Sequence, residues 1–149
     1  MKKLTSHSLE ETQKIARDWL KEISELMHQK GALIVGLSGH LGAGKTAFVK
    51  AVAKELGIRE EITSPTFVIM KIYPLDPPFN TKFQRLIHID AYRLEKAQEL
   101  EALGFERLAA GEDNLIMVEW PENVGLKTKD QIDMKTLPDN DSVEFVFAI

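Results

Sequence analysis

Apolar residues recur every three or four positions in the first part of the chain, which predicts a helix with one buried face. The pattern begins near Leu9, and its apolar positions are Ala16, Trp19, Leu20, Ile23, Leu26 and Met27. Ser8 precedes the pattern and Glu11 follows Ser8 by three residues, as in the capping box that begins many helices. We therefore expect a helix from Leu9 to Met27 with Ser8 as its N-cap.

A strand, a glycine-rich loop and a second helix are expected next. The run from Ala32 to Leu37 is short and apolar enough for a buried strand. Residues 47–56 have helical spacing, and Gly57 is a typical helix end. The segment from Gly36 to Thr46 reads GLSGHLGAGKT and joins the strand to the helix.

The second half of the chain alternates between strand-like and helix-like segments. Strand-like runs lie at residues 66–73, 86–89, 115–118 and 143–149, and a helical pattern covers residues 94–108. Residues 74–82 contain three prolines and are expected to form a loop. The mixture predicts a three-layer α/β domain with a mainly parallel central sheet and antiparallel additions. With no repeat or linker-like block, residues 1–149 are expected to form a single domain.

The glycine-rich loop carries a phosphate-binding motif. GHLGAGKT, from Gly39 to Thr46, matches G-x-x-x-x-G-K-[ST] between a predicted strand and a predicted helix, the context that this motif requires. Glycines let backbone N–H groups wrap a phosphate chain, and a helix N-terminus adds the positive end of its dipole. Lys45 would reach the β- and γ-phosphates, and the Thr46 hydroxyl would bind Mg²⁺. These features predict a P-loop NTPase-like fold that binds a nucleotide with Mg²⁺.

Two acidic residues stand at the ends of predicted strands. Asp90 follows the run LIHI, and Glu119 follows LIMV. The carboxyl ends of strands line the ligand crevice of an open α/β sheet. A carboxylate at that edge could hold Mg²⁺ or orient the attacking water. The residues alone leave the division of roles between Asp90 and Glu119 open.

Composition limits the classes of partner. The chain of 149 residues has 44% hydrophobic and 28% charged residues and no apolar run of membrane-spanning length, so we expect no membrane association. The net charge of −4 argues against a direct electrostatic grip on nucleic acid. The absence of cysteine excludes disulfides, and the N-terminal segment lacks a secretory pattern. We expect a cytoplasmic protein.

The motifs together resemble the bacterial TsaE family, formerly called YjeE. They are GHLGAGKT, SPTF (64–67), HIDAYRL (88–94), ELEALG (99–104) and VEWPE (118–122). The resemblance implies a small P-loop ATPase that supports threonylcarbamoyladenosine formation next to the anticodon of tRNAs reading codons that begin with A. It also implies action with the proteins TsaD and TsaB, with TsaC making the activated intermediate. Contact with tRNA would run only through that complex.

The resemblance also implies roles for particular residues. The phosphate-holding residues would be Gly42, Ala43, Gly44, Lys45, Thr46 and Ala47. Thr46 and Glu119 would bind Mg²⁺, and Asp90 would support hydrolysis. Lys45, Asp90 and Glu119 are thus the expected catalytic residues.

Four further positions follow from the resemblance. Thr66 would sit in a switch-like loop that faces the γ-phosphate, and Trp120 would flank the site. Thr12 matches a threonine near the nucleotide base. Arg93 is expected to serve the partner interaction.

The chain departs from the family pattern at two positions. His40 stands where the family usually has Asp, which removes a negative charge beside the phosphates. Ala47 stands where Thr is common, which removes one hydroxyl contact and leaves the backbone N–H. Nucleotide affinity is therefore expected to differ from that of typical members.

Two other functions remain open at this stage. A P-loop kinase for a small metabolite would need an acceptor pocket and usually an arginine-rich lid, and the sequence shows no such cluster. A nucleotide-gated binding module would use ATP only to set its affinity for a partner. A GTPase is disfavoured because the sequence contains neither N-K-x-D nor D-x-x-G. His88 lies in an apolar stretch and is expected to be a packed, hydrogen-bonded core residue rather than a ligand.

Overall fold

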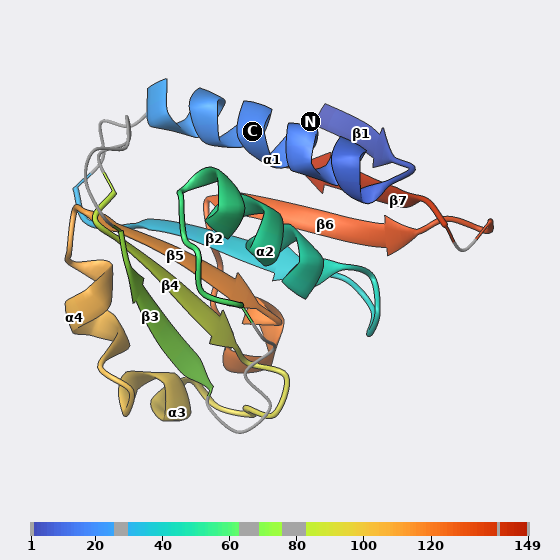
Figure 1. Ribbon diagram of the computed structural model, residues 1–149. Helices are drawn as coiled ribbons and strands as arrows, with labels where there is room; N and C mark the ends of the chain where they lie inside the picture. Colours follow the sequence, from blue (N-terminus) through green and yellow to red (C-terminus); the bar gives the residue numbers. More distant parts are fainter. Residues whose placement is uncertain (1, 26–29, 63–68, 76–82, 140, 149) are drawn as a thin grey trace.

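A computed structural model describes residues 2–25, 30–62, 69–75, 83–139 and 141–148 of the chain (Figure 1). The strands are β1 Lys2–Ser6, β2 Leu33–Ser38, β3 Met70–Pro74, β4 Arg85–Asp90, β5 Asn114–Glu119, β6 Asp130–Thr136 and β7 Val143–Phe147. The helices are α1 Leu9–Glu25, α2 Lys45–Glu55, α3 Ala97–Glu101, α4 Phe105–Ala109 and the 3₁₀ helix η1 Pro121–Val124. The strands form one mixed sheet, and the helices lie on both of its faces.

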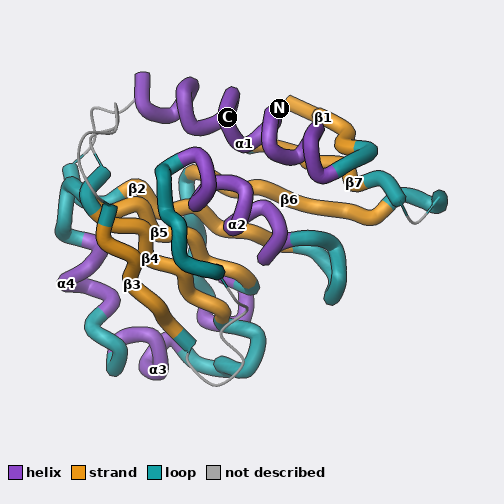
Figure 2. The backbone as a smooth tube through the Cα atoms, viewed as in Figure 1, coloured by secondary structure: helices purple, strands orange, loops and turns teal. Residues whose placement is uncertain are grey.

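The sheet has a parallel centre and antiparallel edges. Its seven strands lie in the order β1-β7-β6-β2-β5-β4-β3. Strands β6, β2, β5 and β4 run parallel to one another, while β3 pairs antiparallel with β4, and β7 pairs antiparallel with both β6 and β1. Figure 2 shows the loop after β2 leading directly into α2 at the carboxyl end of the parallel strands. The predicted fold class is confirmed in this arrangement.

Each face of the sheet has its own apolar core. On one face α1 and α2 cover residues such as Val35, Met117 and Phe145. On the other face Leu100 and its neighbours cover Ile87 and other sheet residues. The alternation of side chains along each strand supplies both cores from the same strands. The three layers follow from this alternation.

The first helix begins as predicted. The Ser8 side chain accepts a hydrogen bond from the Glu11 N–H at 3.1 Å, and Glu11 accepts one from the His7 N–H. The Glu11 carboxylate thus satisfies the amide one residue before the N-cap, a variant of the predicted capping box. The described helix ends at Glu25, and Met27 lies outside the described residues.

Several sequence predictions were wrong in detail. The helical pattern at 94–108 forms two short helices, α3 and α4, because Gly104 between them takes a left-handed φ of 82°. Pro74 ends β3 instead of beginning a loop, because an edge strand tolerates a residue without an N–H. Strand β1 was not predicted, since Leu4 is its only apolar residue. Among the described helices, none has the length and apolarity needed to cross a membrane.

We expect Phe48→Ala to lower the free energy of unfolding by about 3 to 5 kcal/mol. Phe48 is fully buried on α2, with its ring centroid 5.6 Å from that of Trp19 and 5.4 Å from that of Phe145. Truncation would leave a cavity where α1, α2 and the sheet meet. Urea unfolding would measure the change.

Leu9→Ala is the control for Phe48→Ala, because Leu9 is 82% exposed and its loss should cost no more than about 0.5 kcal/mol. A cost below about 1 kcal/mol for Phe48→Ala would contradict this account.

Candidate functional site

The loop between β2 and α2 has the backbone geometry of an anion site. Gly42 and Gly44 take left-handed φ values of 83° and 100°. Gly44 is the N-cap of α2 and has no side chain that could bond the free amides of the first turn. A Cβ at Gly42 would meet nothing within 4 Å, so backbone conformation rather than space calls for glycine there. The loop therefore presents amides and the positive end of α2.

Lys45 is held inside the loop. Its Nζ donates to the carbonyl oxygens of Gly39 and His40 at 2.6 and 2.8 Å, and it lies 4.2 Å from the centroid of the Trp120 ring. The residue is only 4% exposed. Burial lowers the pKa of Lys45, and a group of nearby carboxylates opposes that shift, namely Glu119, Glu122 and Asp90. The Lys45 ammonium donates directly only to neutral carbonyl oxygens. An anionic acceptor such as a phosphate oxygen would form a stronger hydrogen bond with it.

Glu119 joins the phosphate loop to the sheet. The Thr46 hydroxyl donates to Glu119 Oε1 and Oε2 at 2.9 and 3.0 Å. Glu119 is 3% exposed, and its Oε2 also contacts His88 Nε2 at 2.5 Å. The predicted pair of Thr46 and Glu119 is thus in direct contact. His88 is buried and hydrogen-bonded, as expected, but its partner Glu119 was not predicted.

Asp90 lies beside Glu119 at the end of the neighbouring strand. The two residues are register partners in the parallel pair β4 and β5. Asp90 Oδ1 accepts a hydrogen bond from the Tyr92 N–H at 3.0 Å, which turns the chain after β4. The two acids therefore stand side by side at the edge of the sheet that faces the phosphate loop, as the sequence predicted.

Trp120 has a strained backbone. Its φ of 61° is the one left-handed value among described residues other than glycine. Its N–H donates to the Leu37 carbonyl at 3.1 Å, and its ring centroid lies 5.1 Å from that of Tyr92. This geometry turns the indole from the end of β5 toward Lys45. The family resemblance implied that Trp120 flanks the site, but the sequence carried no signal for its conformation.

Glu122 and Ser38 are site residues that the sequence analysis did not assign. Ser38, the last residue of β2, donates from Oγ to Glu122 Oε2 at 2.8 Å. Gln131 Nε2 donates to Ser38 Oγ at 2.7 Å, which extends the network to β6. Two signals could have identified them: a polar residue at the end of the strand before the phosphate loop, and an acid three residues after Glu119.

The donor set fits Mg²⁺ better than a metal caged by protein ligands. No group of three or more His, Asp or Glu residues that could hold an ion occurs in the described part of the chain, and the sequence has no cysteine. Thr46 and Glu119 instead offer one hydroxyl and one buried carboxylate, both oxygen donors. Mg²⁺ typically takes one or two such ligands and completes its shell with waters and phosphate oxygens.

The other predicted positions differ in what the structure describes. Ala43 is a fully buried residue of the loop, and Ala47 is an exposed residue in the first turn of α2. Thr66 lies outside the described residues. Thr12 lies 2.7 Å, hydroxyl to hydroxyl, from Ser6, whose Oγ donates to the Ser8 carbonyl. The role of Thr12 near a nucleotide base stays a prediction.

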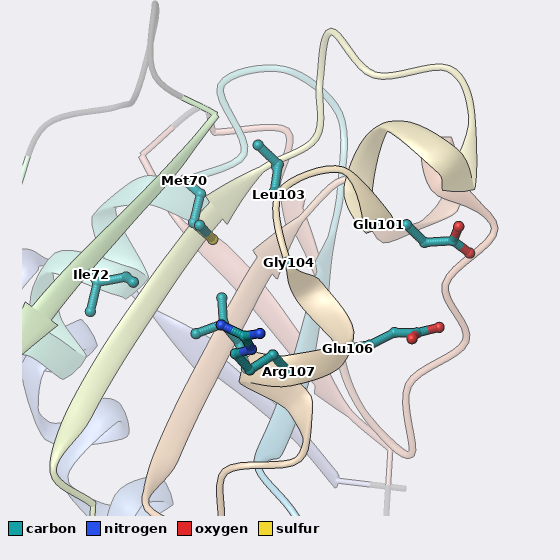
Figure 3. A pocket seen from close by; sticks show the side chains of 8 residues that line it. Met70, Ile72, Glu101, Leu103, Gly104, Glu106 and Arg107 are labelled. Atoms are coloured by element: carbon teal, nitrogen blue, oxygen red, sulfur yellow. The ribbon is translucent and has the colours of Figure 1, made fainter.

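A separate cavity of about 580 Å³ lies between β3 and the segment that carries α3 and α4 (Figure 3). It is lined by Met70, Ile72, Glu101, Leu103, Gly104, Glu106, Arg107 and Leu108. The lining includes neither the phosphate loop nor the acids Asp90 and Glu119. The cavity therefore has no part in the candidate phosphate site.

A family model described as "Threonylcarbamoyl adenosine biosynthesis protein TsaE" matches residues 6–144. The chain belongs to the TsaE family. The sequence resemblance is thereby confirmed over most of the chain, and this family is named for the biosynthesis of threonylcarbamoyladenosine in tRNA.

Individual TsaE relatives are similar to the chain to different extents. A protein of Streptomyces coelicolor named tRNA threonylcarbamoyladenosine biosynthesis protein TsaE is 42% identical over 60% of this chain and 57% of its own length. The TsaE protein of Aquifex aeolicus is 36% identical over 82% of this chain and 78% of its own length. The matches to the Streptomyces relative and to one from Rickettsia prowazekii thus span little more than half of those proteins.

A solved structure supports the fold. The crystal structure of Bacillus subtilus YdiB is 29% identical, with a TM-score of 0.68, and the match covers 98% of this chain and 83% of that chain. The match therefore covers nearly the whole chain, beyond the residues that the motifs cover.

Proposed function

We propose that the chain binds Mg-ATP at residues 42–47, hydrolyses it slowly, and thereby supports threonylcarbamoyladenosine formation in tRNA next to the anticodon. The observation that carries the proposal is the hydrogen bond from Thr46 to Glu119. It joins the helix that begins at the phosphate loop to a buried carboxylate at a strand end. That pairing is what a Mg-nucleotide site of the P-loop kind requires.

The phosphate loop and the two acids, Glu119 and Asp90, have distinct roles in this proposal. The loop amides and Lys45 hold the phosphates, with Lys45 exchanging its two carbonyl partners for phosphate oxygens. Thr46 and Glu119 hold Mg²⁺, which when bound neutralises charge on the β- and γ-phosphates. Thr46 can keep donating to Glu119, because its hydroxyl oxygen retains lone pairs for a metal. Asp90, beside Glu119, orients the attacking water.

The partners in the proposal are TsaD and TsaB, with tRNA reached only through them. The net charge of −4 supports an indirect route to tRNA, since phosphate contacts need clustered cations. Two exposed apolar residues flank the site, Leu41 in the phosphate loop at 69% and Tyr92 after β4 at 50%. Such residues suit a protein partner that covers the nucleotide. Work on tRNA within this complex would place the protein in the cytoplasm.

One experiment separates this function from its alternatives. Reconstituted tRNA modification would be compared with ATP, with a non-hydrolysable analogue and without this protein. The proposal expects a requirement for the protein and for hydrolysable ATP. Full activity with the analogue would favour a nucleotide-gated binding module, and phosphate transfer to a small acceptor would favour a kinase.

We expect the protein to bind the TsaD and TsaB pair more tightly with ATP than with ADP. A ligand shifts a binding equilibrium only through differential affinity for two states. Tyr92, Arg93 and Trp120 follow the ends of β4 and β5, where a partner could sense the γ-phosphate through them. Arg93→Ala should weaken this ATP dependence more than it weakens ATP binding. Binding of the labelled protein to the surface-immobilised partner pair would give the partner affinity with ATP and with ADP.

The matched control is Arg107→Ala, because Arg107 is also exposed but lines the separate cavity. It should leave the ATP dependence of partner binding unchanged. Equal partner affinity with ATP, ADP and no nucleotide would rule out the switch mechanism.

A further inference from the structure

His88 is a buried polar residue in the middle of an apolar strand. It is fully buried on β4, between Ile87 and Ile89, which are also fully buried. Its side chain lies on the sheet face covered by α2, where Glu119 and Thr46 meet. An apolar residue would pack there without the cost of burying an imidazole. The position therefore calls for an explanation beyond packing.

The two ring nitrogens of His88 differ sharply. Nε2 contacts Glu119 Oε2 at 2.5 Å, while Nδ1 is buried and has no hydrogen-bond partner among the described residues. An ionised carboxylate only accepts, so Nε2 is the nitrogen that donates in this contact. One nitrogen is thus left unsatisfied so that the other can donate to Glu119. A buried ring nitrogen without a hydrogen bond costs folding free energy, and the contact with Glu119 must offset that cost.

Without the hydrogen bond from His88, the Glu119 side chain could adopt other conformations. The carboxylate is 3% exposed, and its charge interacts with the Lys45 ammonium, which is held by two carbonyls nearby. A carboxylate freed from His88 could rotate from Thr46 toward Lys45. The imidazole, fixed by the strand and by full burial, contacts Glu119 Oε2 and so opposes that rotation.

We infer that His88 is a positioning residue that holds the Glu119 carboxylate against Thr46 and thereby sets the Mg²⁺ affinity of the site. The inference rests on the proposed function, because it concerns the metal that Thr46 and Glu119 would bind. His88 itself touches neither nucleotide nor metal. Partners that orient a metal-binding side chain are typically worth a tenfold to hundredfold change in metal affinity.

The test compares four variants by the affinity of a fluorescent ATP analogue with Mg²⁺ and with EDTA. His88→Leu and His88→Asn remove the hydrogen-bond donor to Glu119. His88→Gln keeps a donor, because the amide nitrogen of Gln is as many bonds from Cβ as Nε2 of His. Tyr73→Phe is the matched control: Tyr73 is fully buried in the same core, and its hydroxyl also lacks a partner among the described residues.

We expect wild type, His88→Gln and Tyr73→Phe to bind the analogue more tightly with Mg²⁺ than with EDTA. In His88→Leu and His88→Asn, the Mg²⁺ concentration at half-maximal tightening should rise about tenfold to hundredfold, with the affinity in EDTA unchanged. If His88→Leu does not fold, the Asn and Gln pair carries the comparison, since both are amides and only Gln reaches Glu119.

Three results would overturn the inference. One is normal Mg²⁺ dependence in folded His88→Asn. Another is an equal loss of affinity with Mg²⁺ and with EDTA, which would indicate a purely structural role. The third is wild-type binding that ignores Mg²⁺, which would also remove the proposed function, whereas the first two leave that function standing.

Discussion

Lys45→Ala is expected to weaken ATP binding roughly tenfold to hundredfold while the fold stays intact, since a hydrogen bond to a charged group contributes about 1.5 to 3 kcal/mol. The phosphates would lose the one ammonium inside the loop. The fold should tolerate the loss, because burial lowers the pKa of Lys45 and its charge is therefore costly in the free protein. Isothermal titration calorimetry would give the affinity, and thermal unfolding would report the fold.

Lys50→Ala is the matched control for Lys45→Ala. Lys50 lies on the same helix, α2, and carries the same charge, but it is exposed. Its removal should leave ATP affinity within about twofold, because exposed charges are well screened. Unchanged ATP affinity in a folded Lys45→Ala protein would refute the assignment of the phosphate loop.

Glu119→Ala and Asp90→Ala are expected to lower the rate of ATP hydrolysis about a hundredfold or more, with a much smaller effect on nucleotide binding when Mg²⁺ is saturating. The loop amides and Lys45 still hold the phosphates in both variants. Removal of either carboxylate also relieves repulsion with the phosphates, which favours binding. Phosphate release assays at saturating ATP would measure the rate, and nucleotide titration would measure the affinity.

The control for these two variants is Glu112→Ala, at an exposed acid in the turn before β5. Hydrolysis at the wild-type rate in both Glu119→Ala and Asp90→Ala would show that other groups perform the chemistry. A drop in only one of them would assign the step to that residue and resolve the division that the sequence left open.

Local signals made most of the fold predictable. The capping box at Ser8, the apolar periodicity of α1 and the glycines after β2 each act over a few residues, so the sequence displays them directly. Strand β1 has no such signal, because it is stabilised by pairing with β7 at the opposite end of the chain. The break between α3 and α4 depends on the left-handed conformation of Gly104, which a helical spacing pattern does not register.

The candidate site divides in the same way. Lys45, Thr46, Asp90 and Glu119 could be identified because a motif and the ends of apolar runs mark them. The contact between His88 and Glu119 could not, since it depends on the parallel register of β4 and β5. The hydrogen bond from Ser38 to Glu122 likewise joins residues 84 positions apart in sequence.

The helices α1 and α2 begin in opposite ways. Ser8 supplies α1 with a cap from within the chain, whereas Gly44 leaves α2 to be completed from outside. A phosphate bound at the first turn of α2 would be the missing cap of that helix, so ligand and secondary structure would form one cooperative unit. Nucleotide binding and the stability of α2 are then thermodynamically linked, and a change that weakens binding reduces the stabilisation that the nucleotide gives the helix.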